Sequence, residues 1–111
     1  MHINTRTFSD ITVVEVVGDI DGASAPTAQA QLLPHIQPLC KLVLDMSAVG
    51  YMSSAGLRMM LLVFRQTAGA GGQLALTGLS EDIKDTMSLT GFLDFFSTFD
   101  TVDAGVEALQ A

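Results

Sequence analysis

Apolar and polar residues follow two periodicities along the chain, which predicts strands interleaved with helices. Short runs rich in Val, Ile and Leu are typical of strands, and apolar positions repeating every three or four residues are typical of amphipathic helices. The predicted strands cover residues 2–8, 11–17, 41–46 and 73–79, with a short edge strand over 95–99. The predicted helices begin after Ser24, span about 54–70, run from Ser80 to about 89 and cover 102–110. This order favours an α/β fold with a mixed sheet of about four or five strands and about four helices packed on it.

The segment 42–58 reads as a buried strand, a polar turn and the start of a helix. Ser53 and Ser54 stand just before an apolar stripe with helical spacing, formed by Leu57, Met60, Leu61, Phe64 and Ala68. A serine at such a position caps the helix by accepting hydrogen bonds from its first free N–H groups. Its hydroxyl also lies at the positive end of the helix dipole, where a phosphate group would be stabilised. Ser24 and Ser80 are predicted to cap their helices in the same way.

The predicted helix over 54–70 has more apolar residues than one face needs. Met59, Leu62 and Val63 lie outside the core stripe, and Arg58 and Arg65 flank Leu62. Such a helix is either buried on every side or presents a patch to which another protein docks. Methionine suits the second alternative because its flexible side chain adapts to different partners.

Two aspartates, Asp19 and Asp21, stand in a glycine-containing loop after the second predicted strand. One reading makes them solvated charges in a turn, and the other makes them part of a contact surface. Asp45, at the end of a predicted strand, is interpreted as structural, bonding the turn formed by residues 47–50.

Composition narrows the functional classes. The chain has 111 residues, of which 49% are hydrophobic, so one domain over residues 1–111 is expected. Its net charge of −7 disfavours nucleic acid or an anionic membrane as a direct partner, because both need a basic surface. The single cysteine, Cys40, suits a reducing compartment. Because no apolar run reaches the roughly 18 residues of a membrane helix, we expect a cytoplasmic protein without membrane insertion.

Nothing in the sequence nominates an enzyme. His2, His35 and Cys40 lie far apart along the chain, so neither a metal site nor a cofactor is predicted. The glycines of 69–72 follow a predicted helix, where they are typical of a helix end and not of a phosphate-binding loop. Ser53 and Ser54 lack a nearby candidate base, so a serine hydrolase is not predicted.

The run Asp45-x-Ser47-x-x-x-Tyr51-Met52-Ser53-Ser54-Ala55-Gly56-Leu57-Arg58 resembles the signature of the STAS domain family. Within this family it is similar to the stand-alone anti-sigma-factor antagonists, and the Gly18-Asp19-Ile20-Asp21 run falls where the family carries its first acidic loop. The resemblance implies a STAS fold and a signal-transduction role in transcription regulation. In that role the unphosphorylated protein binds a serine kinase that is also an anti-sigma factor. Phosphorylation of a serine at the helix start ends binding, and a serine phosphatase restores it.

The chain departs from the usual family pattern at the phosphorylated position, where Ala55 replaces the serine. We therefore expect phosphorylation at Ser54, with Ser53 as the second choice, or else both serines act only as helix caps. The expected partner-binding residues are Asp19, Asp21, Ser53, Ser54, Arg58, Met59 and Leu62.

The alternative function is a STAS accessory subunit of a membrane transporter, or of another partner-switching complex without a phosphorylation switch. A homodimer through the spare apolar residues or the 95–99 strand also remains open.

Overall fold

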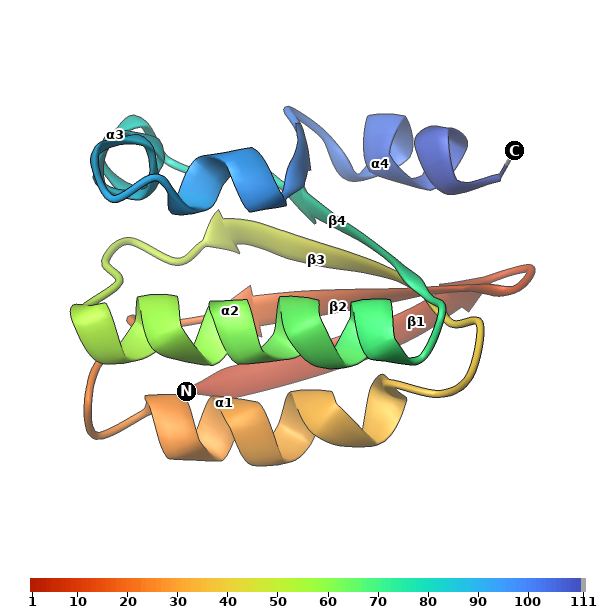
Figure 1. The fold of residues 1–111 in the computed structure, drawn as a ribbon, viewed down its shortest axis with the longest axis horizontal. Coiled ribbons are helices and arrows are strands. Elements are labelled where there is room, and N and C mark those ends of the chain that lie inside the picture. Colours follow the sequence, from red (N-terminus) through yellow and green to blue (C-terminus); the bar gives the residue numbers. More distant parts are fainter. Residues whose placement is uncertain (111) are drawn as a thin grey trace.

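A computed structural model describes residues 1–110 and contains one five-stranded sheet. Residue 111, the last of the predicted domain, lies outside the described residues. The strands follow the order of the chain across the sheet, and they are β1 (His2–Phe8), β2 (Ile11–Val17), β3 (Lys41–Ala48), β4 (Gln73–Thr77) and β5 (Ser97–Phe99). β1 is antiparallel to β2, and the other neighbours are parallel (Figure 1). The prediction of a mixed sheet is confirmed.

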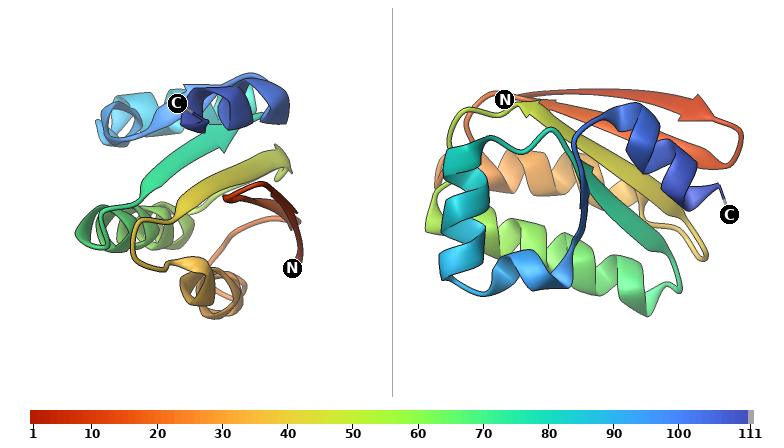
Figure 2. Two further views of the ribbon diagram at one scale, coloured as in Figure 1. Left: turned by 90° about the vertical axis from the view of Figure 1, so that its right-hand side faces the viewer. Right: turned by 90° about the horizontal axis from the view of Figure 1, so that it is seen from above.

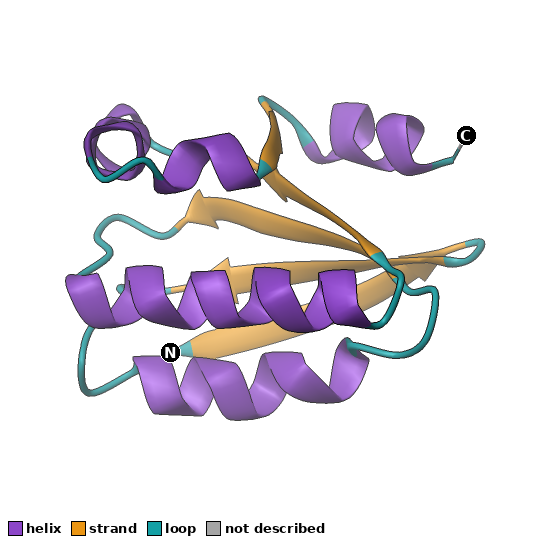
Figure 3. Cartoon of the chain, in the orientation of Figure 1, coloured by secondary structure: helices purple, strands orange, loops and turns teal. Residues whose placement is uncertain are grey.

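Helices cover both faces of this sheet. Within residues 1–110 the α-helices are α1 (Ala25–Leu32), α2 (Ser54–Gly69), α3 (Glu81–Leu89) and α4 (Val102–Leu109). Two 3-10 turns, η1 (Leu33–His35) and η2 (Phe92–Phe95), link neighbouring elements. α1 and α2 run side by side along one face, and α4 lies across the other (Figures 2 and 3).

The central strands are buried on both sides, which explains their continuous apolar runs. Val14 and Leu44 face the large core shared with α1, α2 and α3, whereas Val13 and Val43 face the smaller core under α4. The predicted α4 stripe packs there through Val102, Val106 and Leu109. The sheet is therefore a rigid base from which the loops at its edges project.

Three strand boundaries differ from the prediction. β3 continues to Ala48 because it keeps pairing with β2 beyond a register shift. β4 ends at Thr77, since Gly78 has a φ of +70° that leaves the extended conformation. β5 begins only at Ser97, because the preceding residues form η2 and pack the rings of Phe95 and Phe96 against Phe64, at centroid distances of 5.8 and 5.4 Å.

The buried side of α2 also differs from the prediction. Leu57 and Met60 are buried as expected, but Leu61 and Phe64 are only partly buried. The remaining buried apolar side chains of the helix are Met59 and Val63, at 3% and 0% exposure. The cause is that α2 packs against α1 as well as the sheet, so it buries a wider stripe than one face requires.

Candidate functional site

The loop after β2 and the start of α2 are joined by backbone hydrogen bonds. The N–H of Ile20 donates to the carbonyl oxygen of Tyr51 at 2.9 Å, and the N–H of Ser53 donates to that of Ile20 at 2.8 Å. Gly56 allows this close approach, because a Cβ there would lie 2.7 Å from the Ile20 carbonyl oxygen. The acidic loop and the serine pair therefore meet at the carboxyl ends of β2 and β3, as ligand-binding loops do in parallel sheets.

The two serines have different environments. Ser53 is the N-cap of α2, and its hydroxyl accepts a hydrogen bond from the Gly56 N–H at 3.4 Å. Ser54 is the first residue of the helix, its side chain is exposed, and its hydroxyl makes no hydrogen bond within residues 1–110. The predicted cap is confirmed for Ser53, and the hydroxyl that another protein can reach freely belongs to Ser54.

Asp21 holds the acidic loop in shape. Its carboxylate accepts hydrogen bonds from the N–H groups of Ala23 and Ser24, at 2.9 and 3.0 Å. These bonds, chiefly the one from Ser24, lower the pKa of Asp21 below its ordinary value of 3.8 because they favour the charged form. Asp19 is exposed on the same loop. Asp21 is thus a loop-forming residue, while Asp19 presents its charge to solvent.

The prediction that Ser24 caps α1 through its side chain is wrong. Its hydroxyl donates to the Asp19 carbonyl oxygen at 2.7 Å and accepts from the Asp21 N–H at 3.0 Å. Both bonds point back into the loop, so the hydroxyl is not available to the free N–H groups of the helix. Asp45 has the structural role expected, accepting from the N–H and hydroxyl of Ser47 at 3.1 and 2.7 Å, but Ser47 lies in β3, so these bonds hold the end of the strand and not the predicted turn.

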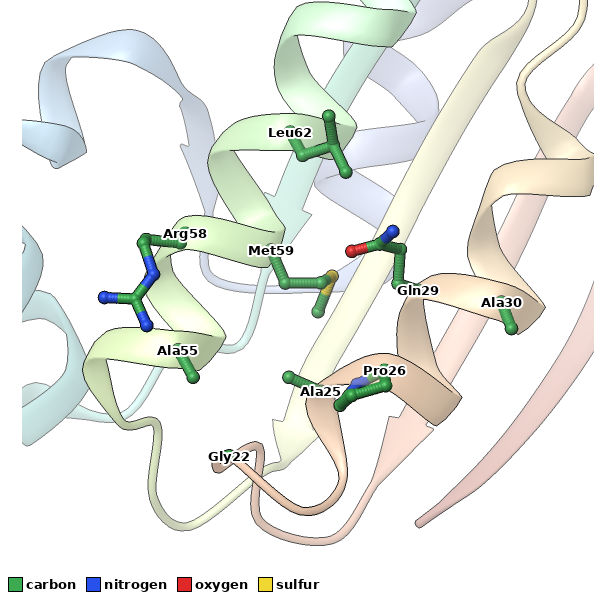
Figure 4. Close-up of a pocket in the computed structure, with 9 residues that line it drawn as sticks. All are labelled: Gly22, Ala25, Pro26, Gln29, Ala30, Ala55, Arg58, Met59 and Leu62. Carbon is green, nitrogen blue, oxygen red and sulfur yellow. The ribbon is translucent and has the colours of Figure 1, made fainter.

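A groove of about 550 Å³ separates the first turns of α1 and α2. It is lined by Gly22, Ala25, Pro26, Gln29 and Ala30 on one side, and by Ala55, Arg58, Met59 and Leu62 on the other. Met59 and Gln29 point toward one another between the helices, whereas Arg58 extends along the outer side of α2 near Ala55 (Figure 4). Ala55, which follows the exposed Ser54 in the chain, is the groove-lining residue nearest the start of α2.

Of the predicted contact residues on α2, Arg58 and Leu62 are accessible and Met59 is not. Arg58 is exposed, Leu62 is partly buried at the groove, and Met59 is 3% exposed. The expectation that Met59 lies outside the core is therefore wrong, because α1 covers it. Met59 shapes the floor of the groove and presents almost no surface of its own.

Two features of the site were missed in the sequence. Tyr51 is 56% exposed in the turn before α2, although its backbone is tied to Ile20. A large aromatic residue directly after Gly50, in a predicted turn, was the signal for it. Pro26 and Gln29 form the α1 side of the groove, and no sequence signal identifies them because their role depends on how α1 packs against α2.

The arrangement suits binding and surface modification. It combines an exposed hydroxyl, a groove and an acidic loop, and within residues 1–110 no three His, Cys, Asp or Glu side chains gather as metal ligands. No helix in the same part of the chain has the length and apolar character needed to cross a membrane.

The chain is similar to known proteins in both sequence and structure. Residues 2–105 match the STAS domain. A candidate anti-sigma factor antagonist, BtrV of Bordetella bronchiseptica, is 31% identical over 111 residues, covering 99% of this chain and 96% of the relative. The anti-sigma-B factor antagonist of Bacillus subtilis is 31% identical over 107 residues, covering 96% and 98%.

The fold is also that of a solved structure from Thermotoga maritima, a candidate anti-sigma factor antagonist. The TM-score is 0.90 at 17% identity, over 98% of this chain and 95% of that one. The match to the family's domain covers nearly the whole chain, and the mixed sheet with its helices agrees with the resemblance in the sequence. The chain therefore belongs to the STAS domain family, and its relatives of similar length are named anti-sigma factor antagonists.

Proposed function

We propose that this protein is an anti-sigma factor antagonist that binds a serine kinase serving as an anti-sigma factor. Binding uses the acidic loop, the first turns of α2 and the groove beside them, and phosphorylation of Ser54 ends it. A serine phosphatase restores the binding form. The observation that carries the proposal is the exposed Ser54 at the start of α2, next in the chain to the groove residue Ala55. The chain is also 31% identical to two proteins named anti-sigma factor antagonists.

Exposure favours Ser54 over Ser53 as the acceptor. A kinase must place the hydroxyl against its nucleotide, which requires a side chain free to leave its own neighbours. Ser53 is partly buried and caps the helix, while Ser54 is exposed. Ala55 occupies the usual acceptor position, but it has no hydroxyl to accept a phosphate, and it is one of the residues that line the groove.

Electrostatics explains how one phosphate could switch binding without unfolding the domain. A phosphoserine carries about −1.5 to −2 charges. At the start of α2 this charge faces free N–H groups and the positive helix end, which stabilises the helix by about 0.3–1 kcal/mol. Arg58 lies one turn further along, at the spacing where opposite charges on a helix attract.

The same charge is costly at an interface. Burying an ion without a partner costs several kcal/mol, whereas about 1.4 kcal/mol already changes affinity tenfold. The cost at the interface therefore exceeds the gain in the helix. The nearby Asp19 adds to the effect, because it already gives this edge of the molecule negative charge.

The test has two stages. The full chain, carrying an affinity tag, is used to recover its partner from the source cells, and the recovered protein is identified by mass spectrometry. A serine kinase supports the proposal, and transporter subunits without a kinase would contradict it in favour of an accessory subunit.

The recovered kinase is then incubated with ATP and the wild-type, Ser54→Ala or Ser53→Ala protein. Addition of one phosphate that only Ser54→Ala prevents is expected, together with loss of kinase binding. No incorporation, or incorporation elsewhere, would overturn the switch.

A further inference from the structure

β1 forms a free edge of the sheet that is long and regular and carries little of the usual protection against pairing. It has seven residues, most of them exposed, and it pairs with β2 without a register shift. Natural edge strands are normally kept apart by shortness, proline, lysine or bulges. β1 has none of these features, and its one strongly charged side chain is Arg6, whereas β5 at the opposite edge has only three residues. Figure 2 shows β1 uncovered along the outside of the sheet.

Charge is distributed so that two copies could approach through this edge. The chain has 12 acidic residues, but the one Asp, Glu, Lys or Arg within residues 1–9 is Arg6. Residues 22–40 contain no residue of these four types. The second segment includes α1, which packs beside β1. Five of the acidic residues lie between 81 and 100, in the segment that leads from α3 to the end of β5 at the opposite edge of the sheet. The repulsion that opposes self-association of a chain with net charge −7 is therefore weakest at β1.

The hairpin geometry fixes which backbone groups of β1 face outward. A two-residue loop joins Phe8 to Ile11, and in such a hairpin the closing pair exchanges its two hydrogen bonds. Bonded and outward-facing positions then alternate along the strand. The N–H and C=O groups of Ile3, Thr5 and Thr7 consequently point away from β2.

We infer that β1 pairs antiparallel with β1 of a second copy of this chain, continuing the sheet across a two-fold axis at Thr5. In this register Thr5 lies opposite Thr5 of the other copy, and Ile3 lies opposite Thr7. The three outward residues of each copy then exchange about six hydrogen bonds, two for each pair. Paired threonines are a favourable cross-strand combination.

The side chains on the other face of β1 complement one another in the same register. Asn4 of one copy lies opposite Arg6 of the other. The Asn4 Nδ2 donates to Glu15 Oε1 at 3.0 Å, which leaves its Oδ1 to accept from the Arg6 guanidinium across the axis. Arg6 also approaches the negative charge of Glu15, so each copy places its one β1 cation beside the other's carboxylate. Two such contacts form by symmetry.

The first test measures mass against protein concentration by sedimentation equilibrium. Wild-type protein is expected to pass from one chain to two as concentration rises. Thr5→Pro removes an outward N–H and leaves the bonds to β2 in place, because proline is tolerated at edge positions facing solvent. This variant is expected to stay a single chain. A wild-type protein that remains one chain at all concentrations would overturn the inference.

A matched pair of charge changes separates the proposed contact from general repulsion. Arg6→Glu and Arg65→Glu alter the net charge equally, but Arg65 is an exposed residue of α2 away from β1. Arg6→Glu is expected to weaken association at least tenfold, and Arg65→Glu to leave it nearly unchanged. Equal effects, or none from Arg6→Glu, would contradict the pairing.

Amide hydrogen exchange on the wild-type chain gives a test that needs no variant to fold. The amides of Ile3, Thr5 and Thr7 are expected to exchange fast in dilute solution and slowly in concentrated solution. Those of Asn4 and Arg6, bonded to β2, are expected to exchange slowly at both concentrations. A concentration-dependent dimer without this alternation would place the contact elsewhere and overturn the assignment to β1.

Discussion

The backbone N–H of Ser53 donates to the carbonyl oxygen of Ile20 at 2.8 Å. This bond links the residue that caps α2 to the centre of the acidic loop. Ile20 and Met52 also form an isolated parallel bridge, so the loop extends the pairing of β2 and β3 beyond the sheet. The proposed contact surface is thus a rigid unit that includes the exposed Ser54, and a partner would meet it in one conformation.

Gly56→Ala should disrupt this unit. An added Cβ would lie 2.6 Å from Met52 Cγ and 2.7 Å from the Ile20 carbonyl oxygen. Overpacking of this kind destabilises the fold by about 1–3 kcal/mol, which exceeds the stabilisation expected from the higher helix propensity of alanine. Thermal unfolding should show a clear loss. Gly69→Ala in the same helix is the control, since nothing lies within 4 Å of its Cβ position, and it should be neutral or stabilising by about 0.5 kcal/mol.

Replacing each serine should separate capping from modification. Ser53→Ala removes the cap and should lower the free energy of unfolding by about 0.5–1 kcal/mol, while phosphate incorporation by the kinase continues. Ser54→Ala should leave thermal stability nearly unchanged and abolish incorporation. Loss of incorporation in Ser53→Ala with retention in Ser54→Ala would reverse the assignment of the acceptor.

An acidic residue at two neighbouring positions of α2 should have opposite consequences. Leu62→Asp places a charge at the edge of the groove, so kinase binding measured by calorimetry should weaken at least tenfold with a small change in melting temperature. Met59→Asp buries the charge under α1 and should cost several kcal/mol, enough to unfold much of the protein. Binding that survives Leu62→Asp would exclude the groove from the interface.

The acidic loop should lose stability in acid. Because hydrogen bonds lower the pKa of Asp21 in the folded state, its carboxylate stabilises the fold above the unfolded pKa, and this contribution disappears as pH falls through the folded value. The difference in melting temperature between wild type and Asp21→Ala should therefore be constant near neutral pH and shrink below about pH 3.8. A difference that persists unchanged in stronger acid would show that the carboxylate charge is not involved.

Local signals in the sequence predicted the fold well because each element carries its own start, stop and period. Ser80 precedes α3 and Gly91 follows it, as expected. The Ser80 hydroxyl accepts from the Ile83 N–H, and Gly91 adopts a φ of +77°. The α4 stripe likewise identified the side that packs on the sheet. The failures arose where distant residues compete for the same group, as when the loop takes the Ser24 hydroxyl from α1.

The candidate site could be predicted only in part for the same reason. Ser54 stands out because a helix start is a local feature. The burial of Met59 depends on α1, which lies about thirty residues earlier, and periodicity within α2 does not reveal that neighbour. The groove is a product of that packing, so its α1 side had no signature of its own.

Chain-order arrangement of the strands has a consequence for biosynthesis. As the polypeptide leaves the ribosome, every new strand finds its lateral neighbour already formed, beginning with the β1–β2 hairpin. No strand has to be inserted between two others, so the sheet can grow from one side. α4 is the last element to form, and it covers the second face of the sheet. Until it packs there, a nascent chain exposes Val13 of β2 and Val43 of β3 on that face.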